Sequence, residues 1–528
     1  MDKFLLLLMI FAPLVAAGVV LSLGSNQLRL VRQVSLGTTL LSLLCALHVV
    51  YHYHPSTGRT AEQPFASDPA FEIRIPWMSY LPTSGSLTQP GIEFHLGVDG
   101  ISIWLIALTA LLMVSAVLIS WNSIQTNPAG YYSLLMLLST GMIGVFCALD
   151  IILFYIFFEF TLLPLFFLIG IWGGPQKRYA ARKFFLYTLA GSLVTLVGLV
   201  AIVLSLVNQG QPMTFSLPEL ARQVAIQPLP IDMQKLIFLA LFCGLAIKVP
   251  LFPFHTWLPL AHVEAPTAGS VLLAGVLLKL GTYGFLRLCI PMVPAASLQI
   301  GVPLIGVLAT IGILYGSFCA LAQKDIKKMV AYSSVAHLGF CMLGLFALNA
   351  EGMTGSLLQM VNHGLSTGLL FLLVGMIYER YHTRQMNELG GLTQRMPIMG
   401  LVMMFTCLSS IGLPGLNGFV GEFLCLSGMF ARNPVYTVWG TIGIVLGAWY
   451  LLSFVMKCFH GPLKEPPSAA GHTMHDMDRR ELAATLPLVA LCLWIGLYPK
   501  PFIERMQPEI EALSQRIKQQ TPLIQRPR

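Results

Sequence analysis

Long apolar runs follow one another along almost the whole chain, beginning with Phe4–Leu23. A helix of roughly 20 apolar residues is long enough to cross the hydrocarbon core of a bilayer. Inside lipid, every backbone polar group has to be satisfied within the protein, so repeated runs of this length fold as spanning helices. The pattern therefore predicts an all-α polytopic membrane protein.

We expect about fourteen membrane-spanning helices from the lengths of these runs. They are placed near residues 4–23, 34–52, 101–121, 131–148, 150–170, 182–207, 233–249, 266–288, 300–322, 329–349, 357–378, 396–424, 435–456 and 482–499. The first run is interpreted as a retained helix and not as a signal peptide, because it lacks a clear small-residue cleavage site. In the polar loop between the second and third runs, alternating residues near Phe71–Pro76 and Ile92–Val98 predict a small β-hairpin.

Composition agrees with a membrane protein and excludes two other classes. Hydrophobic residues make up 56% of the sequence and charged residues 10%, against ~25% charged residues in soluble domains. The net charge of +8 comes from Lys and Arg in short loops and in the tail, which indicates membrane topology and not nucleic-acid binding. The ten cysteines occur singly without metal-ligand spacing, so no metal, haem or iron–sulfur site is predicted.

The distribution of basic residues predicts both termini on the outer side of the membrane. With the N-terminus outside, the inner loops hold Arg29, Arg32, Lys177, Arg178, Arg182, Lys183, Lys324, Lys327, Lys328, Arg380, Arg384, Arg395, Lys457, Lys464, Arg479 and Arg480. The outer side holds fewer, namely Lys3, Arg59, Arg74, Arg222, Lys235, Arg287 and Arg432. The basic tail would also lie outside, against the positive-inside rule, but short loops are stronger evidence than a tail.

Two lysines, Lys248 and Lys279, fall inside runs that otherwise read as membrane-spanning. A lysine at the bilayer centre costs roughly 2.5–3.5 kcal/mol, so its presence there indicates a function. Between the two lysines lies a connector with several prolines that also carries His255, His262 and Glu264. The prolines after Lys248 interrupt its helix, and interrupted helices at membrane depth line cavities.

Two glutamates complete the set of ionisable groups inside the runs. Glu159 lies five residues before Pro164. Glu422 lies at the end of Ile411–Phe423, a stretch rich in glycine that predicts a second break in addition to the one after Lys248. Broken helices at matching positions in two halves are typical of inverted repeats in transporters. Between the two breaks lie His337 and His363, and a row of acids, lysines and histidines is what a proton relay needs.

A structural interpretation remains open at each of these positions. Glu159 and Lys248 could form a fixed ion pair between helices, and Lys279 could extend to an interface. The histidines His255, His262, His337 and His363 could be packing residues. We interpret Asp325, Lys327 and Lys328 as an ordinary helix start, where negative charge is favourable.

Several long motifs resemble those of the antiporter-like membrane subunits of respiratory complex I, the NADH:quinone oxidoreductase. They are GVDGIS at Gly97–Ser102, FFEFTLLPL around Glu159, AARKFFLYTLAGS at Ala180–Ser192, AIKVPLFPFHTWLPLAHVEAPTAGS with LLKLGTYG, KKMVAYSSVAHLGF, and NHGLSTGLLFL followed by NELGGL. The resemblance covers nearly the whole chain. Phe158 departs from it, because many relatives have tryptophan there, and Leu260 stands where many have a polar residue.

The resemblance implies a fold of fourteen helices with two inverted five-helix repeats and discontinuous helices. Its segments would be 1–121 with three helices, 122–289 as the first repeat, 290–459 as the second, and 460–528 with the last helix and a polar tail. Glu159, Lys248, Lys279 and Glu422 would correspond to the family's ionisable row. Sister subunits and multi-subunit cation/proton antiporters usually carry lysine at the position of Glu422, whereas one type of complex I subunit carries glutamate.

The resemblance also implies proton translocation in the bacterial inner membrane, driven by redox chemistry in partner subunits. Protons would move along Glu159, Lys248, Lys279 and Glu422, with His255, His337 and His363 as relay candidates. This chain would bind no cofactor, while NADH, FMN, iron–sulfur clusters and quinone would be bound by partner subunits. Its partners would be other membrane subunits of complex I, especially sister antiporter-like subunits, and lipid. The alternatives are a cation/proton antiporter subunit, a structural membrane scaffold and, with weaker support, a quinone-binding chain.

Overall fold

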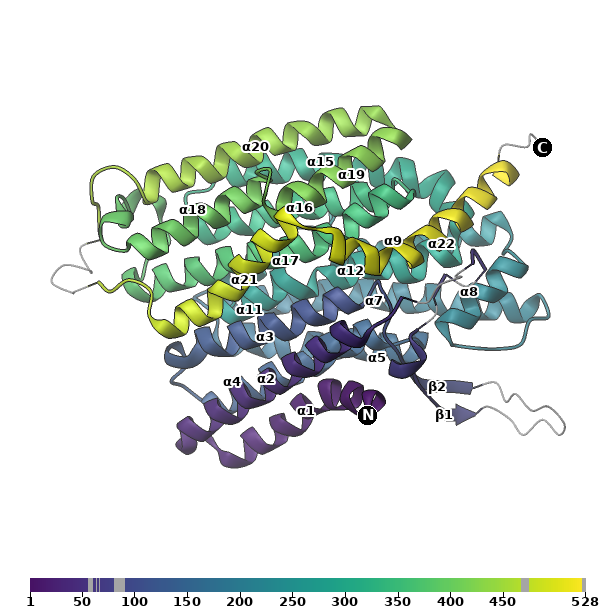
Figure 1. Cartoon of the computed structure of the whole chain (residues 1–528), viewed down its shortest axis with the longest axis horizontal. Helices are drawn as coiled ribbons and strands as arrows, with labels where there is room; N and C mark the ends of the chain where they lie inside the picture. The colour runs from purple at the N-terminus through teal and green to yellow at the C-terminus, as the bar shows by residue number, and fades with distance from the viewer. Residues whose placement is uncertain (56–59, 63, 66, 80–90, 467–473, 525–528) are drawn as a thin grey trace.

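The computed structural model describes residues 1–55, 60–62, 64–65, 67–79, 91–466 and 474–524. Its main part is a bundle of long helices that run roughly side by side (Figure 1). In the described ranges, twelve helical stretches are long and apolar enough to cross a membrane. The outer surface of the bundle carries many exposed large hydrophobic side chains, among them Leu186 at 63% and Val197 at 66%. An apolar outer surface is expected where helices face lipid.

Seven helices build the first half of the bundle. They are α1 (Asp2–Leu23), α2 (Leu28–His52), α3 (Ile103–Ser123), α4 (Pro128–Cys147), α5 (Ile151–Phe160), α6 (Leu162–Trp172) and α7 (Lys177–Asn208). The helices α5 and α6 form one span that is interrupted only at Thr161. Pro164 lies three residues after this interruption.

The second half contains several discontinuous helices. After α8 (Leu217–Ile226), α9 (Ile231–Lys248) and α10 (Leu258–Glu264), one span comprises α11 (Thr267–Leu272), α12 (Lys279–Gly284) and α13 (Ile290–Met292), joined by π-helical turns. The remaining elements are α14 (Pro294–Ala296), α15 (Val302–Leu321), α16 (Ile326–Leu345), α17 (Ala350–Tyr381), α18 (Pro397–Ile411), α19 (Asn417–Arg432), α20 (Pro434–Cys458), α21 (Arg479–Leu497) and α22 (Lys500–Ile524).

The predicted number of fourteen spans is not confirmed, and the difference lies at the two predicted breaks. The run near 233–249 becomes α9, an 18-residue helix that carries three charged residues, Asp232, Lys235 and Lys248. The run near 396–424 is divided into α18, with 15 residues, and α19, with 16 residues. The other twelve predicted runs coincide with the twelve spanning stretches.

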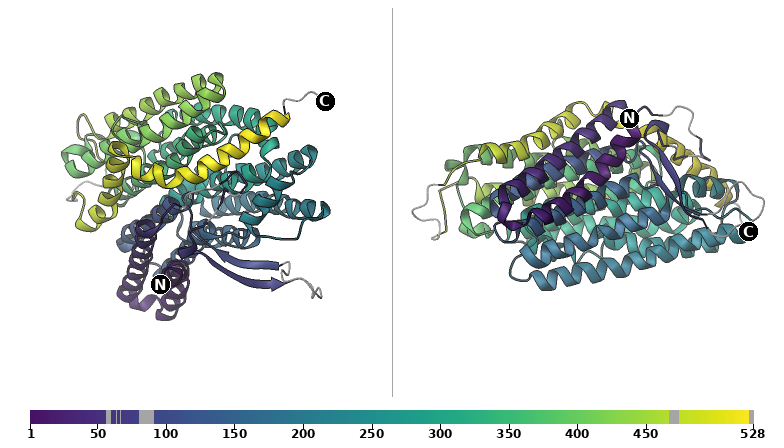
Figure 2. Two further views of the ribbon diagram at one scale, coloured as in Figure 1. Left: turned by 45° about the vertical axis from the view of Figure 1, so that its right-hand side comes forward. Right: turned by 90° about the horizontal axis from the view of Figure 1, so that it is seen from below.

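The predicted hairpin is confirmed by the antiparallel pair β1 (Ile73–Ser79) and β2 (Gly91–Leu96). It projects from one end of the bundle (Figure 2). Arg59, Arg526 and Arg528, which contribute to the predicted orientation, lie outside the described residues.

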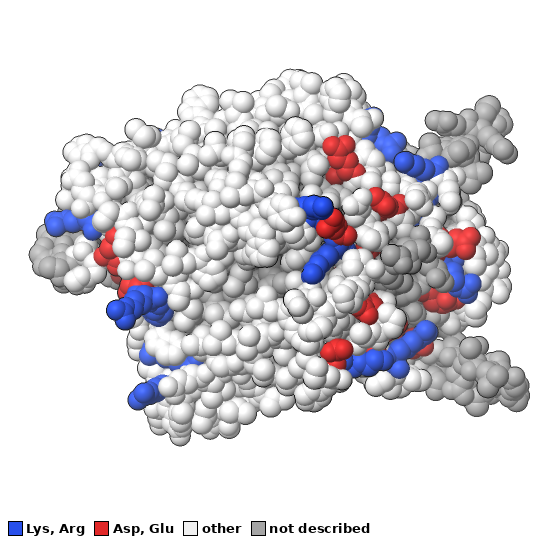
Figure 3. Space-filling model, in the orientation of Figure 1, with Lys and Arg blue, Asp and Glu red and all other residues white. Residues whose placement is uncertain are grey.

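Residues 500–524, predicted only as part of a polar tail, form the amphipathic helix α22, which lies across the bundle (Figure 1, yellow). Hydrogen bonds attach it to the first helices: the Trp104 indole donates to Phe502 O at 3.0 Å, and Glu509 Oε1 accepts from Gly100 N and Tyr53 OH, both at 2.8 Å. On the face in Figure 3, charged side chains gather at the left-hand end and right of centre, with a broad uncharged area between them.

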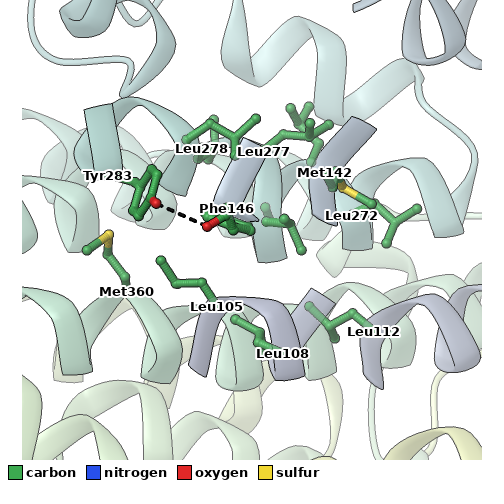
Figure 4. Close-up of a cluster of buried hydrophobic side chains, with 14 of the residues drawn as sticks. Leu105, Leu108, Leu112, Met142, Phe146, Leu272, Leu277, Leu278, Tyr283 and Met360 are labelled. Carbon is green, nitrogen blue, oxygen red and sulfur yellow. Dashed lines mark hydrogen bonds between the residues drawn. The ribbon is translucent and has the colours of Figure 1, made fainter. Parts of the chain in front are cut away.

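The core between α3, α4, the broken span and α17 is apolar (Figure 4). Leu108 and Leu112 of α3 face this span and α17, and the Tyr283 hydroxyl donates to Phe146 O at 3.2 Å. The helices α7 and α9 approach closely, because a Cβ on Gly244 would overlap Gly191 O. This packing sets the position of the end of α9, where Lys248 lies.

Candidate functional site

Glu159 lies half-buried near the end of α5, beside a groove shared with Tyr155 and Phe185. Its Oε1 atom is buried and has no hydrogen-bond partner in the described part of the chain. The carboxylate and Lys248 attract each other electrostatically, but they do not form an ion pair within 4.0 Å among the described residues. The fixed-pair interpretation of these two residues therefore lacks a direct contact.

Lys248 is the last residue of α9 and is 4% exposed. Its ammonium lies 4.6 Å from the centroid of the Phe158 ring, and an aromatic face attracts a cation. Phe158 is the residue that departs from tryptophan in many relatives, and it still supplies an aromatic face. The lysine is thus held between the ring of Phe158 and the break that follows it.

The break after Lys248 satisfies its own backbone more fully than predicted. Pro250 has no N–H group to donate to Ala246 O, its usual partner in a helix. Leu251 N donates to this carbonyl instead, at 2.9 Å. The Trp257 indole donates to Ile247 O, also at 2.9 Å. His255 is buried in the same segment, where its ring stacks on Phe252, and its Nδ1 atom has no partner among the described residues.

His262 lies on the short helix α10 with no exposed surface. Its ring stacks on Phe371 with 4.6 Å between centroids and 9° between planes. Neither ring nitrogen has a hydrogen-bond partner within the described residues. Among the described residues, His262 has no hydrogen bond or ring contact with another histidine, which agrees with its interpretation as a packing residue.

Lys279 begins α12 at the centre of the broken span and has no exposed surface. Its ammonium donates to Ala274 O and lies 2.6 Å from His363 Nδ1 on α17. Gly281 on the same helix packs directly against Val249 at the break after α9. Lys279 therefore does not extend to an interface.

Glu422 and His337 continue the path from His363. The ring centroids of His363 and His337 are 5.7 Å apart, and His337 Nδ1 donates to Glu422 Oε1 at 2.9 Å. Gln359 Nε2 donates to the same carboxylate oxygen at 3.1 Å. The structure thus brings Lys279, His363, His337 and Glu422 into one continuous line, which we call the polar row.

The break before α19 positions Glu422 in the polar row. Gly412 ends α18 in the left-handed region, with φ of 81°, which favours glycine. Asn417, at the start of α19, accepts from the Ser409 hydroxyl at 2.5 Å, and its carbonyl accepts from Asn362 Nδ2 at 2.7 Å. These bonds fasten the broken helix to α17, the helix that carries His363.

Several buried polar atoms along the polar row have no hydrogen-bond partner in the described ranges. They are His363 Nε2, His337 Nε2, Gln359 Oε1, Asn362 Oδ1, Thr282 Oγ1 and Thr367 Oγ1. Buried polar atoms are normally paired with protein or ordered water. Such a concentration of them is suited to hold internal water, as a proton path requires.

Arg287, predicted in an outer loop, is instead fully buried within the broken span. Its Nη1 and Nη2 donate to Asp99 Oδ2 at 2.5 Å and to Asp99 Oδ1 at 2.8 Å, and its Nε donates to the Tyr283 hydroxyl at 3.1 Å. The placement of Arg287 on the outer side was wrong, because an arginine at the end of an apolar run usually lies at the membrane surface. Its partner lies 188 positions earlier in the chain.

The helix start at Asp325 is confirmed, because its side chain accepts from Lys328 N at 3.0 Å. Lys327, however, is buried and donates to Ala265 O at 2.6 Å. It lines a cavity at this end of the bundle together with Glu264 and Arg384. The sequence did not predict the burial of Lys327 or its place in the cavity wall, because a lysine beside a helix start usually faces solvent.

No group of three or more His, Cys, Asp or Glu side chains that could hold a metal ion occurs in the described ranges. Seven of the ten cysteines lie after residue 264, and six of these seven are buried.

Comparison with known proteins places these residues in a family. Residues 148–447 match the family described as "NADH:quinone oxidoreductase/Mrp antiporter, TM". The chain is 41% identical to NADH-quinone oxidoreductase subunit M of Rhodobacter capsulatus over 518 residues, which cover 97% of this chain and 96% of that relative.

Two solved structures share the fold. A chain of respiratory complex I from Thermus thermophilus superposes with a TM-score of 0.83 at 30% identity, covering 98% of this chain and 100% of that chain. A chain of the Mrp complex from Dietzia superposes with a TM-score of 0.77 at 19% identity, covering 99% of each. With twelve apolar spans in the described part of the chain, this is a multi-pass membrane protein. The chain belongs to the family of transmembrane subunits that NADH:quinone oxidoreductases and Mrp antiporters share.

Proposed function

We propose that this chain is a proton-translocating membrane subunit of NADH:quinone oxidoreductase, respiratory complex I. The observation that carries the proposal is the polar row, in which Lys279, His363, His337 and Glu422 follow one another at contact distance or near it. The similarity to subunit M supports complex I as the assembly. The polar row supports movement of protons within this chain.

The hydrogen bonds of the two histidines define complementary tautomers. A neutral His363 that accepts from Lys279 at Nδ1 carries its hydrogen on Nε2, whereas a neutral His337 that donates to Glu422 from Nδ1 has an acceptor at Nε2. The two unpartnered Nε2 atoms therefore form a donor and an acceptor. A proton released by Lys279 to His363 Nδ1 would drive the Nε2 proton of His363 to His337, directly or through water, and His337 would protonate Glu422.

Glu159 would control Lys248 at the start of the path by charge. By Coulomb's law at an effective dielectric constant near 20, bringing opposite charges from ~10 Å to ~4 Å strengthens their attraction by about 2.5 kcal/mol. The structure holds the pair beyond direct contact. A movement that closes or opens this gap would favour or disfavour the charged form of Lys248.

The energy has to come from outside this chain. Moving one proton against ~150 mV costs about 3.5 kcal/mol. In the proposed assembly, partner subunits bind NADH, FMN, iron–sulfur clusters and quinone, and this chain binds no cofactor. Its direct neighbours would be sister antiporter-like subunits and lipid. The assembly would lie in the bacterial inner membrane, with both termini of this chain on the outer side.

Substitution of Lys248 or Glu159 distinguishes a pump from a scaffold. We expect Lys248→Met and Glu159→Gln to assemble but to lower NADH-driven proton pumping by roughly tenfold or more through this chain, since a positioned proton-transfer group contributes about 10²–10⁴-fold. Pumping is measured in vesicles that contain the purified complex. Lys235→Met, on the exposed part of the same helix α9, and Glu351→Gln, at the exposed start of α17, are the matched controls.

Normal pumping by Lys248→Met and Glu159→Gln, with impaired assembly, would instead support a scaffold. Transport that depends on sodium in the same vesicles would support the cation/proton antiporter, which usually has lysine at the position of Glu422.

A further inference from the structure

A second polar cluster lies far from the polar row, at the end of the bundle where α2 and α21 begin and α3 and α17 end. It consists of Arg32 of α2, Trp121 of α3, Tyr132 of α4, Glu379 of α17 and Arg480 of α21, and we call it the arginine cluster. This is the left-hand end of the bundle in Figure 1, where α21 begins. None of its members takes part in the proposed proton path.

The members of the arginine cluster face one another across several helices. The Arg32 guanidinium lies 5.8 Å from the centroid of the Trp121 ring. Tyr132 has no exposed surface, its hydroxyl lies beside the Arg32 guanidinium, and it interacts electrostatically with both Arg32 and Arg480. Glu379 interacts in the same way with Arg480. Helices from both halves of the chain therefore converge on one set of charges.

The polar atoms of the cluster are buried without partners among the described residues. They are Arg32 Nε and Nη2, Arg480 Nε and Nη1, Tyr132 OH and Glu379 Oε1. A buried guanidinium nitrogen without an acceptor is costly, so such groups are normally paired. Arg480 Nη2 donates to Asp478 Oδ2 at 3.5 Å, whereas Arg480 Nε and Nη1 have no hydrogen-bond partner in the described part of the chain.

The chemistry of the unpaired atoms specifies a ligand. Two guanidinium groups and one hydroxyl present donors to an acceptor-rich anion, and the planar guanidinium matches a phosphate group. Arg480 already pairs with Asp478 and attracts Glu379, whereas Arg32 has no ion pair among the described residues. The unpaired Glu379 oxygen suits an ammonium group beside the phosphate. The ends of spanning helices and a tryptophan indicate the depth of the lipid headgroups.

We infer that the arginine cluster binds a phosphate group, held between Arg32 and Arg480 with Tyr132 as an additional donor. A phospholipid headgroup and inorganic phosphate share this chemistry. A site of this kind would join α2 to α21 through a bound ligand, in addition to direct packing between helices.

The test compares two double variants that remove the same charge from the same two helices. Arg32→Gln with Arg480→Gln removes the cluster, and Arg29→Gln with Arg479→Gln removes two neighbouring exposed arginines. Each is purified within its assembled complex, and bound phospholipid is counted by native mass spectrometry and total phosphorus. Binding of ³²P-labelled inorganic phosphate is measured after delipidation.

We expect the cluster variant to lose about one phospholipid per chain relative to the wild type, and the control variant to keep it. If the ligand is inorganic phosphate, the cluster variant keeps its lipid and loses labelled phosphate instead. Tyr132→Phe, which removes one hydroxyl from the core, weakens retention of the same ligand and serves if the double variant fails to assemble. Equal lipid and equal phosphate binding in all four proteins would overturn the inference.

Discussion

Lys279→Met is expected to stop proton movement through this chain while leaving the complex assembled. Lys279 is buried at the centre of the broken span, and its ammonium is in contact with His363. Without it, His363 loses the ammonium that contacts its Nδ1 atom. A positioned proton-transfer group contributes about 10²–10⁴-fold, so we expect the loss to be on the order of 100-fold for this path.

The substitution Lys279→Arg distinguishes a role of Lys279 in proton transfer from a role as a fixed positive charge. Arginine keeps the positive charge and the hydrogen-bond donors, but it does not release its proton in proteins. We expect both variants to fail in NADH-driven pumping, measured as the proton-to-electron ratio in vesicles. Lys457→Met, at the exposed end of α20, is the control that removes a lysine elsewhere. An arginine variant that pumps at the wild-type ratio would show that Lys279 acts only through its charge.

Arg287→Met is expected to give the largest loss of stability. The pair between Arg287 and Asp99 is fully buried, and removal of one partner leaves a buried charge, which costs about 3–5 kcal/mol. Asp99 also accepts from Ile101 N and Ser102 N at the start of α3, so the damage would reach that helix. Thermal unfolding of the purified complex and the fraction assembled measure the effect.

A second substitution, at Asp99, tests whether the unpaired charge causes the loss of stability in Arg287→Met. Asp99→Asn combined with Arg287→Met removes both charges and keeps an oxygen for the backbone donors, so it should be more stable than Arg287→Met alone. Arg74→Gln breaks the exposed pair with Glu93, and such surface pairs contribute only about 0–1 kcal/mol. If the double variant is no more stable than Arg287→Met, the loss comes from packing and not from an unpaired charge.

The selection of the four ionisable residues rests on the cost of placing charge in a membrane. Lys248, Lys279, Glu159 and Glu422 stand out because each interrupts an apolar run, and the breaks beside Lys248 and Glu422 follow from proline and glycine. The structure places Lys279 and Glu422 in one row. Whether these residues move protons stays a prediction.

The features of the site that were not predicted depend on contacts between residues far apart in the sequence. The contact between Lys279 and His363 joins residues 84 positions apart, and the pair of Arg287 with Asp99 joins residues 188 apart. The count of basic residues by loop assigned Arg287 to the outer side, although the predicted span near 266–288 includes it. The helix α22 was not predicted, because an amphipathic segment beside the bundle is not apolar enough to resemble a span. The arginine cluster is formed by five helices and has no motif of its own.

The space between the two histidine rings offers the most direct test of proton conduction along the polar row. A high-resolution cryo-electron microscopy map of the assembled complex shows whether ordered water lies between His363 Nε2 and His337 Nε2. A proton relay predicts either a water molecule within hydrogen-bond distance of both atoms or direct contact between them. A dry gap filled by apolar side chains, with no water along the row from Lys279 to Glu422, would contradict it.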